Sequence, residues 1–203
     1  DSPFGVLQQR IFSAAYEWHN YGKSTIGNRS DIERVPVEAL RRFYKKYYRP
    51  DNVVLVVAGK FDPKRALELV QQYFGILENP PGKLEATYTI EPPQDGERET
   101  FVRRVGATQL AAVAYHIPAG SDPSFAAVNM LGPIFGNDPS GRLYKSLVET
   151  KKATSVAGYA MDLHDPSLIM FVCEVPRDKS LDDARDTMIH TVEQSLREKP
   201  ITQ

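Results

Sequence analysis

Residues 155–175 read SVAGYAMDLHDPSLIMFVCEV, two strand-like runs joined by a turn. The first run spans residues 155–163 and the second spans residues 167–175, and both are rich in the β-branched and aliphatic side chains that favour strands. The intervening His-Asp-Pro sequence at residues 164–166 is typical of a turn. The sequence therefore predicts two neighbouring strands, of which the second lies in an apolar run.

Two further strands are predicted before this pair. Residues 100–105 and the stretch QLAAVAYHI at residues 109–117 both have strand character. Gly106 separates them, which indicates a second hairpin.

Helices are predicted between and after these strands. Asp122 and Pro123 begin one helix, which Pro133 is expected to kink or shorten, and a short helix follows at residues 143–148. Ser180 is the expected capping residue of a last helix. Paired strands alternating with paired helices favour the α+β class, as a two-layer α/β sandwich, over a doubly wound parallel sheet.

The first half of the chain is predicted to contain three helices and one strand. A Ser-Pro pair at residues 2–3 begins a helix that runs to about Trp18, and the helical periodicity then stops over residues 19–35. An Asp-Pro pair at residues 62–63 begins another helix, which ends at Gly75.

A continuous aliphatic run, VVLVVAG at residues 53–59, has the length of a strand. Because it shows no alternation of apolar and polar residues, it predicts a central strand buried on both faces.

The helix predicted between Pro36 and Pro50 has two chemically different sides. Its cationic side is expected to be solvated, and its apolar side is expected to be buried. The apolar side consists of Leu40, Phe43, Tyr44 and Tyr47. Aromatic and cationic residues alternate in RRFYKKYYRP, residues 41–50, so a nucleic-acid stacking platform is an alternative interpretation, although the buried amphipathic helix is preferred.

Composition shifts between Gly75 and Arg98, where proline and glycine become frequent. We place a Pro/Gly-rich linker at residues 83–97, which separates residues 1–82 from residues 98–203.

Overall composition limits the kinds of partner that the chain is expected to bind. Lys and Arg number 25 and Asp and Glu number 26, so the net charge of −1 argues against a partner held by bulk charge, such as duplex DNA or an anionic membrane. The apolar runs are too short for a membrane span. The single cysteine, Cys173, lies in an apolar run and predicts a buried thiol. The N-terminal DSPFGV has neither an initiator Met nor a targeting segment, which indicates a piece of a longer protein.

No local motif predicts catalysis. The histidines are too far apart for zinc-finger or HExxH spacing, and Glu17 and His19 are two residues apart and point away from each other on a helix. Ser140, in PSGR, lacks a GxSxG elbow, and the glycines match neither a phosphate loop nor a dinucleotide pattern. The histidines are His19, His116, His164 and His190, and the glycines are Gly22, Gly27, Gly136 and Gly141.

Three segments together resemble a known peptidase family. They are DSPFGVLQQRIFSAAYEWHNYGKSTIG at residues 1–27, DIERV at residues 31–35 followed by LRRFYKKYYRPDNVVLVVAGKFD at residues 40–62, and SGRLYKSLVE at residues 140–149. This combination is similar to the pitrilysin/insulinase/mitochondrial processing peptidase family of zinc metallopeptidases, bacterial type, which carries an inverted HxxEH motif. The resemblance is most specific over residues 1–62.

The resemblance implies two similar α+β domains of the LuxS/processing-peptidase type. Two His of HxxEH and a downstream Glu would hold zinc, and the Glu of the motif would be the general base. In that family these residues precede the helix that begins here near Ser2. Residues 1–82 would then be the C-terminal part of the first domain, and residues 98–203 the N-terminal part of the second.

We therefore expect no catalytic residue and no zinc ligand in this fragment, which would be inactive alone. Zn²⁺ would be the cofactor of the full-length parent, a zinc metalloendopeptidase acting on peptides or unfolded proteins. Family members that hold substrate with the second half place an Arg and a Tyr seven residues apart, and Val148 and Ser155 occupy those positions here. Neither side chain can replace a guanidinium or a phenol, so the substrate-binding residues stay unassigned.

The resemblance also implies partners. Since bacterial relatives often work in pairs, a subunit of the same family would supply the Arg and Tyr, and the alternative is a non-catalytic, pseudo-enzyme parent that acts as a structural or partner subunit. Nucleic acid is not an expected partner, and relatives of this type are often exported, which implies the periplasm or cell envelope. A strand at residues 53–59 without its neighbours would leave an open edge, which predicts a homodimer of the fragment or a cover from its second half.

Overall fold

The computed structural model describes residues 2–86, 88–198 and 201. The chain divides into two compact units, which we call the sheet unit and the open unit. The sheet unit combines residues 1–15 with residues 94–203, and the open unit spans residues 16–93. The division after Pro93 falls among the residues expected to form the linker, whereas the N-terminal helix belongs to the sheet unit.

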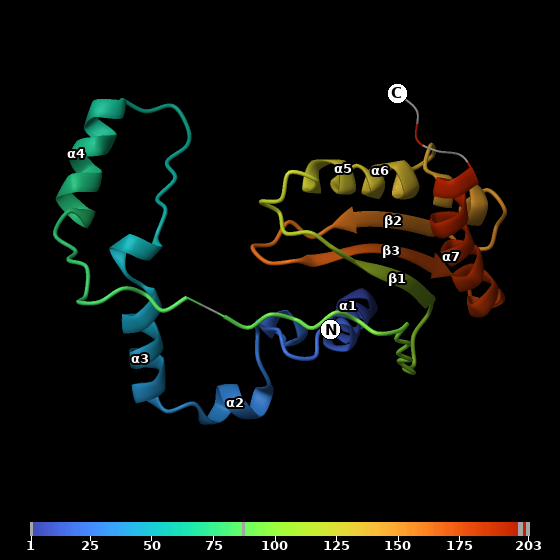
Figure 1. The fold of residues 1–203 in the computed structure, drawn as a ribbon, viewed down its shortest axis with the longest axis horizontal. Helices are drawn as coiled ribbons and strands as arrows, with labels where there is room; N and C mark the ends of the chain where they lie inside the picture. The colour runs from blue at the N-terminus through green and yellow to red at the C-terminus, as the bar shows by residue number, and fades with distance from the viewer. Residues whose placement is uncertain (1, 87, 199–200, 202–203) are drawn as a thin grey trace. The chain divides into compact units, whose positions relative to one another are not determined.

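Three antiparallel strands form the sheet, in the order β1-β3-β2 (Figure 1). They are β1 (Gln109–Ile117), β2 (Ser155–Ala160) and β3 (Ser167–Val175). Phe171 of β3 lies opposite Val113 of β1 and Gly158 of β2. Every residue of β3 except Glu174 is buried, which explains why its sequence is almost continuously apolar. The strands predicted on both sides of residues 164–166 are confirmed, with β2 ending at Ala160.

Helices cover one face of this sheet. They are α5 (Phe125–Asn129), α6 (Leu131–Gly136), the π-helical turn η3 (Tyr144–Val148) and α7 (Leu181–Glu198). The core between them and the sheet includes Phe135, Leu147, Phe171 and Met188, all at most 1% exposed. The backbone amide of Asp183 donates to the Ser180 hydroxyl at 3.2 Å, so the predicted cap of α7 is confirmed.

Helix α6 packs closely on β2 because glycines line the contact. A Cβ added to Gly136 would lie 2.3 Å from the backbone nitrogen of Gly158, and one added to Gly132 would lie 2.9 Å from the carbonyl oxygen of Gly158. The two backbones therefore approach more closely than any larger residue would allow.

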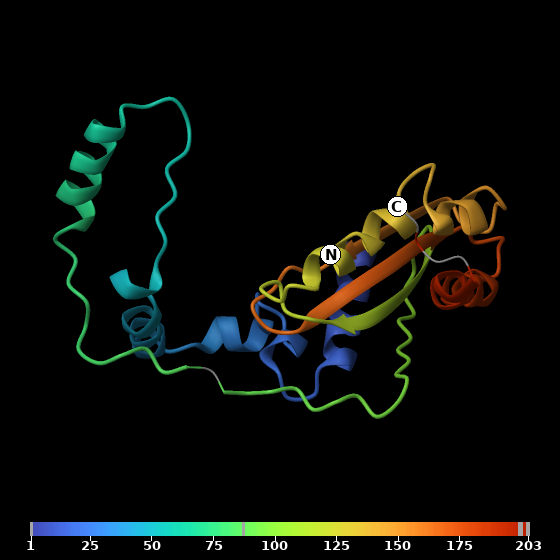
Figure 2. The same cartoon turned by 45° about the horizontal axis from the view of Figure 1, so that its top comes forward.

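The N-terminal helix α1 (Pro3–Ala15) lies against the opposite face of the sheet (Figure 2). Phe4 makes an edge contact with Tyr159, with ring centroids 6.2 Å apart, and Tyr159 projects from β2 away from the helical core. The Arg98 guanidinium donates to the carbonyl oxygen of Ala14 at 2.8 Å and so caps the end of α1. The α+β class predicted from the sequence is confirmed, and α1 adds cover on the second face.

The regular elements in the described part of the open unit are all helical, and the unit contains few buried residues. Its elements are η1 (Asn20–Gly22), α2 (Arg29–Arg34), α3 (Val37–Tyr47), η2 (Pro50–Asn52) and α4 (Pro63–Phe74). Asp62 accepts hydrogen bonds from the backbone amides of Lys64 and Arg65, which confirms the predicted start of α4. Among the described residues of this unit, Tyr16, His19 and Arg49 are buried. Within the described chain, no helix has both the length and the apolarity to cross a membrane.

Four predictions from the sequence are wrong. Residues 53–59 and 100–105 pair with no strand in the described part of the chain, and the side chains of residues 53–57 are 49–87% exposed. The aromatic side of α3 is exposed rather than buried, with Phe43 at 58% and Tyr44 at 60%. Residues 19–35, predicted as a loop, contain α2. The first three errors share one cause: an apolar pattern becomes a buried strand or helix face only where another segment covers it.

Candidate functional site

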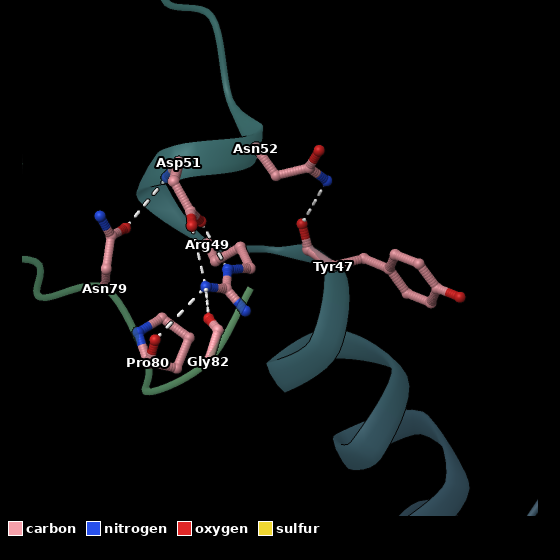
Figure 3. Close-up of polar contacts among 7 residues, drawn as sticks. All are labelled: Tyr47, Arg49, Asp51, Asn52, Asn79, Pro80 and Gly82. Atoms are coloured by element: carbon pink, nitrogen blue, oxygen red, sulfur yellow. Dashed lines mark hydrogen bonds and ion pairs between the residues drawn. The ribbon is translucent and has the colours of Figure 1, made fainter. Parts of the chain in front are cut away.

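Arg49 is a buried cation that joins two distant stretches of the open unit (Figure 3). The residue is only 7% exposed. Its guanidinium donates to both carboxylate oxygens of Asp51, with the Nη2 bond at 2.8 Å. Nη2 also donates to the carbonyl oxygens of Gly82, at 2.6 Å, and Pro80, at 3.3 Å. The end of α3 is thereby held to a turn that follows 31 to 33 residues later.

Neighbouring side chains extend this connection. The backbone amide of Asp51 donates to the side-chain oxygen of Asn79 at 3.0 Å, and the Asn52 side chain donates to the carbonyl oxygen of Tyr47 at 3.0 Å (Figure 3). We call Arg49, Asp51, Asn52, Asn79 and Gly82 the Arg49 staple. The staple closes the stretch of chain that contains α4, because residues at both ends of this stretch belong to the staple.

Both partners of the central ion pair are held in their charged forms. The hydrogen bond from Arg49 is the largest cause that lowers the pKa of Asp51 below its usual 3.8, although partial desolvation opposes it. The same bond raises the pKa of Arg49. The contact is therefore a bidentate, charge-assisted pair at neutral pH. It holds two chain segments in place rather than taking part in catalysis.

A second ordered cluster is the aromatic loop, residues 16–22. The rings of Tyr16, His19 and Tyr21 contact one another, with centroid separations of 4.2–5.8 Å. A Cβ on Gly22 would lie 2.7 Å from the carbonyl oxygen of Tyr16, so the loop can fold back on itself only with glycine there. Desolvation is the main cause that raises the pKa of Tyr16, which keeps its phenol neutral.

Glu91 binds the backbone of the aromatic loop. Its carboxylate accepts hydrogen bonds from the amides of Glu17 at 2.7 Å, Trp18 at 3.0 Å and His19 at 2.9 Å. Both carboxylate oxygens take part. A residue 72 to 74 positions later in the chain therefore fixes the segment that follows α1.

An apolar groove of about 390 Å³ lies between α4 and the extended residues 55–61. Its lining includes Leu55, Val57, Phe61 and Tyr73. Exposed apolar side chains continue on both sides of the extended segment, with Val54 87% exposed and Val56 79% exposed. Contiguous apolar surface of this kind is typical of a face that another segment or protein covers.

The histidines singled out in the sequence lie on separate elements. His116 is exposed on β1, His190 is exposed on α7, and His164 lies in the turn after β2 beside Asp165. The Nδ1 atom of His19 accepts the backbone N–H of Tyr21 at 3.1 Å, so that nitrogen is committed to the aromatic loop. Glu17 and His19, the candidate pair, therefore stabilise the aromatic loop, Glu17 through its backbone amide and His19 through its ring.

The other candidates belong to the sheet unit. Cys173 is buried on β3, as predicted, and desolvation raises the pKa of its thiol to about 11. Gly136 and Gly141 are buried where a Cβ would strike the backbone, and Ser140 is exposed in the loop between them. Gly27 has a positive φ of 82° in a turn.

The residues that the structure describes do not fit a catalytic zinc site. Over the described residues, no group of three or more His, Cys, Asp and Glu side chains is placed to hold a metal ion. A hydrolytic zinc needs three such ligands and an open position.

Val148 and Ser155 occupy neighbouring ends of two elements. Val148 is half-buried at the end of η3, and Ser155 is exposed at the start of β2. Arg142 lies, like Val148, in the SGRLYKSLVE segment. It donates from Nη1 to the Ser195 carbonyl at 2.8 Å and lies over the ring of Phe135. Arg142 thus holds the end of α7.

A family model described as the peptidase M16 inactive domain matches residues 34–203. This chain belongs to the M16 family. Zinc protease PqqE of Helicobacter pylori is 32% identical over 175 residues, which are 85% of this chain and 39% of PqqE. The uncharacterized zinc protease YmxG of Bacillus subtilis is 25% identical over 170 residues, which are 83% of this chain and 40% of YmxG. The family resemblance predicted from the three sequence segments is therefore confirmed.

Solved structures show the same M16 fold. A crystal structure of a protease from Helicobacter pylori matches with a TM-score of 0.91 and 27% identity, covering 100% of this chain and 49% of that one. The M16 inactive domain from Pseudomonas fluorescens matches with a TM-score of 0.81 and 17% identity, covering 100% of this chain and 48% of that one, which is a similarity of fold. This M16 chain thus spans about two fifths of the length of its curated relatives.

Sequence reasoning missed the two polar residues that order the open unit. No individual role is predicted for Arg49 from the sequence, and Glu91 lies within the predicted linker at residues 83–97. A signal was available for Arg49, because the Arg-Pro-Asp-Asn sequence at residues 49–52 places a cation beside a carboxylate at the end of a helix. For Glu91 no local pattern reveals a bond to residues 17–19.

Proposed function

We propose that this chain is a non-catalytic part of a zinc-dependent M16 endopeptidase, whose metal is held by other residues of the whole protein. The observation that carries the proposal is the match of residues 34–203 to the M16 inactive domain. The name zinc protease, printed for PqqE at 32% identity, supports a peptidase as the parent. The substrate class would be peptides or unfolded proteins.

The chemistry of the described residues supports this division of labour. They provide no zinc ligand set, whereas their polar clusters bind backbone groups of the same chain. The exposed apolar groove beside α4 supports a scaffold whose surface the remainder of the parent, or a partner subunit, would cover. In isolation the same surface is expected to promote self-association, which light scattering would detect as a dimer.

A partner subunit that supplies substrate-binding residues is part of the proposal. Val148 and Ser155 offer an aliphatic group and a short hydroxyl, neither of which can bind a peptide carbonyl as a guanidinium or a phenol does. The same observation favours the second candidate, a pseudo-enzyme subunit whose role is structural.

Peptide cleavage and zinc content would test the proposal together. We would measure cleavage of a quenched fluorescent peptide and bound zinc for this chain and for the whole protein, with and without 1,10-phenanthroline. We expect stoichiometric zinc and chelator-sensitive turnover only in the whole protein, alone or mixed with its partner. Zinc-dependent turnover by this chain alone would refute the proposal. A whole protein that binds no zinc would establish the pseudo-enzyme alternative.

A further inference from the structure

Three successive backbone amides of the aromatic loop converge on one carboxylate. The amides belong to Glu17, Trp18 and His19, and their distances to the Glu91 oxygens are 2.7, 3.0 and 2.9 Å. These distances are typical of N–H···O hydrogen bonds. Such bonds are charge-assisted where the acceptor is a carboxylate. Successive amides that point to one place form a concave anion site.

The loop is shaped for this arrangement by its own packing. Helix α1 ends at Ala15, so the amides that follow have left the helical ladder. Tyr16 is buried against the rings of His19 and Tyr21, and Gly22 returns the chain to the Tyr16 carbonyl. The end of α1 on one side and the packed return at Gly22 on the other therefore restrict the positions of the three amides.

We propose that the amides of residues 17–19 form a carboxylate-binding site, that Glu91 fills it from within the chain, and that this bond orders the aromatic loop. Both oxygens of Glu91 are used, one by Glu17 and the other by Trp18 and His19, so the site recognises a planar, two-oxygen anion. Removal of the Glu91 side chain would open the site to a small free carboxylate, such as formate or acetate. The inference does not depend on the peptidase proposal, because the bonds lie within the open unit.

The chain carries its own reporter for this site. Trp18 is the single tryptophan, its amide is one of the three donors, and its side chain is 66% exposed. Its fluorescence therefore reports on the aromatic loop without labelling.

The test is chemical rescue of Glu91→Ala in the full 203-residue chain. Without additive, we expect altered Trp18 emission and amide exchange about ten- to a hundredfold faster at residues 17–19, since bonds to a charged acceptor are lost. Sodium formate or acetate should restore both, with half-effect at about 1 mM or above, because a free ion lacks the effective concentration of a tethered side chain. Sodium chloride at equal ionic strength should not. Glu97→Ala removes an exposed carboxylate of the same segment and should match the wild type.

Two outcomes would overturn the proposal. One is a Glu91→Ala protein whose Trp18 emission and amide exchange equal those of the wild type. The other is rescue by chloride as effective as rescue by formate, which would show a general salt effect. If Glu91→Ala does not fold, Glu91→Gln provides the test, because its amide keeps one acceptor oxygen; faster exchange at residues 17–19 supports the site, and unchanged exchange refutes it.

Discussion

Two apolar runs of similar character have opposite environments in this chain. SLIMFVCEV forms β3, with strands on both sides and helices over its faces, and it is buried at every position but Glu174. VVLVV at residues 53–57 is extended, pairs with no described strand and is at least 49% exposed. Both runs are rich in residues that favour strands, so the neighbours decide which run enters a core. Residues 53–57 thus have a strand sequence without a sheet.

Different forces consequently hold the two units. In the sheet unit, each fully buried aliphatic or aromatic side chain contributes roughly 1.5–3 kcal/mol of burial free energy. In the open unit, hydrogen bonds and ion pairs predominate, and a net hydrogen bond contributes only about 0.5–1.5 kcal/mol. We expect the sheet unit to unfold cooperatively and the open unit to loosen first.

The largest expected contrast is in thiol reactivity. Cys173 is buried on β3 and has its pKa raised to about 11 by desolvation, so little thiolate forms and reagent cannot reach it. In native buffer Ellman's reagent should label it more than about a thousandfold more slowly than in urea. Val56→Cys in a Cys173→Ala background should react at nearly the unfolded rate, because position 56 is 79% exposed. Equal rates at the two sites would remove the contrast.

Removal of one aromatic ring from each unit should show how differently buried and exposed rings contribute to the free energy of unfolding. Phe171→Ala removes a ring that is 1% exposed and packs against Phe135, so it should lower the free energy of unfolding by about 3–5 kcal/mol. Phe74→Ala removes a ring that is 52% exposed and should change it by less than about 0.5 kcal/mol. Urea titration followed by circular dichroism measures both. A loss at Phe74 as large as that at Phe171 would show that the open unit has a core of its own.

The close approach of α6 to β2 can be tested with a single methyl group. Gly136→Ala would place Cβ 2.3 Å from the Gly158 nitrogen. Because the three nearest atoms all belong to the backbone of Ala157 and Gly158, the helix must shift. We expect a loss of about 1–3 kcal/mol in the free energy of unfolding. Gly96→Ala in the same unit is the matched control, since a Cβ there meets nothing within 4 Å. Comparable losses in the two variants would point to general loss of glycine rather than to packing.

Local sequence signals sufficed wherever an element is completed by residues near it. The cap at Ser180, the Asp62 start of α4 and the apolar β3 are all local patterns, and the structure confirms them. The strand prediction for residues 53–59 is wrong because a strand also requires a neighbouring strand, which the local sequence does not reveal.

The polar residues of the site show the same limit. Glu91 binds amides more than 70 residues away, and Arg49 reaches carbonyl groups more than 30 residues away. Backbone acceptors and donors carry no sequence signature, so such contacts can be found only from coordinates. Family resemblance did succeed without coordinates, since it depends on the order of whole segments rather than on any one contact.

Acid should loosen the open unit through the Arg49 staple, and this is the smallest of the expected effects. The folded pKa of Asp51 lies below its usual 3.8 because Arg49 donates to its carboxylate. A lowered pKa means that the pair stabilises the folded form at neutral pH and that this contribution is lost as the pH falls through the lowered value. Proteolysis near residues 79–82 by pepsin should accelerate in that range in the wild type, with each rate divided by that for an unstructured peptide at the same pH because pepsin itself is more active in acid.

Asp51→Asn separates the staple from other acid effects. The pKa of Asp122, in the sheet unit, is also lowered, by its bonds to Ser124, so acid sensitivity alone does not identify the group. The variant should be cleaved faster than the wild type at pH 5 and should show less further acceleration on acidification, because the titrating group has been removed. An unchanged acid response would assign the loosening to another carboxylate and would leave the open unit held chiefly by the aromatic loop and Glu91.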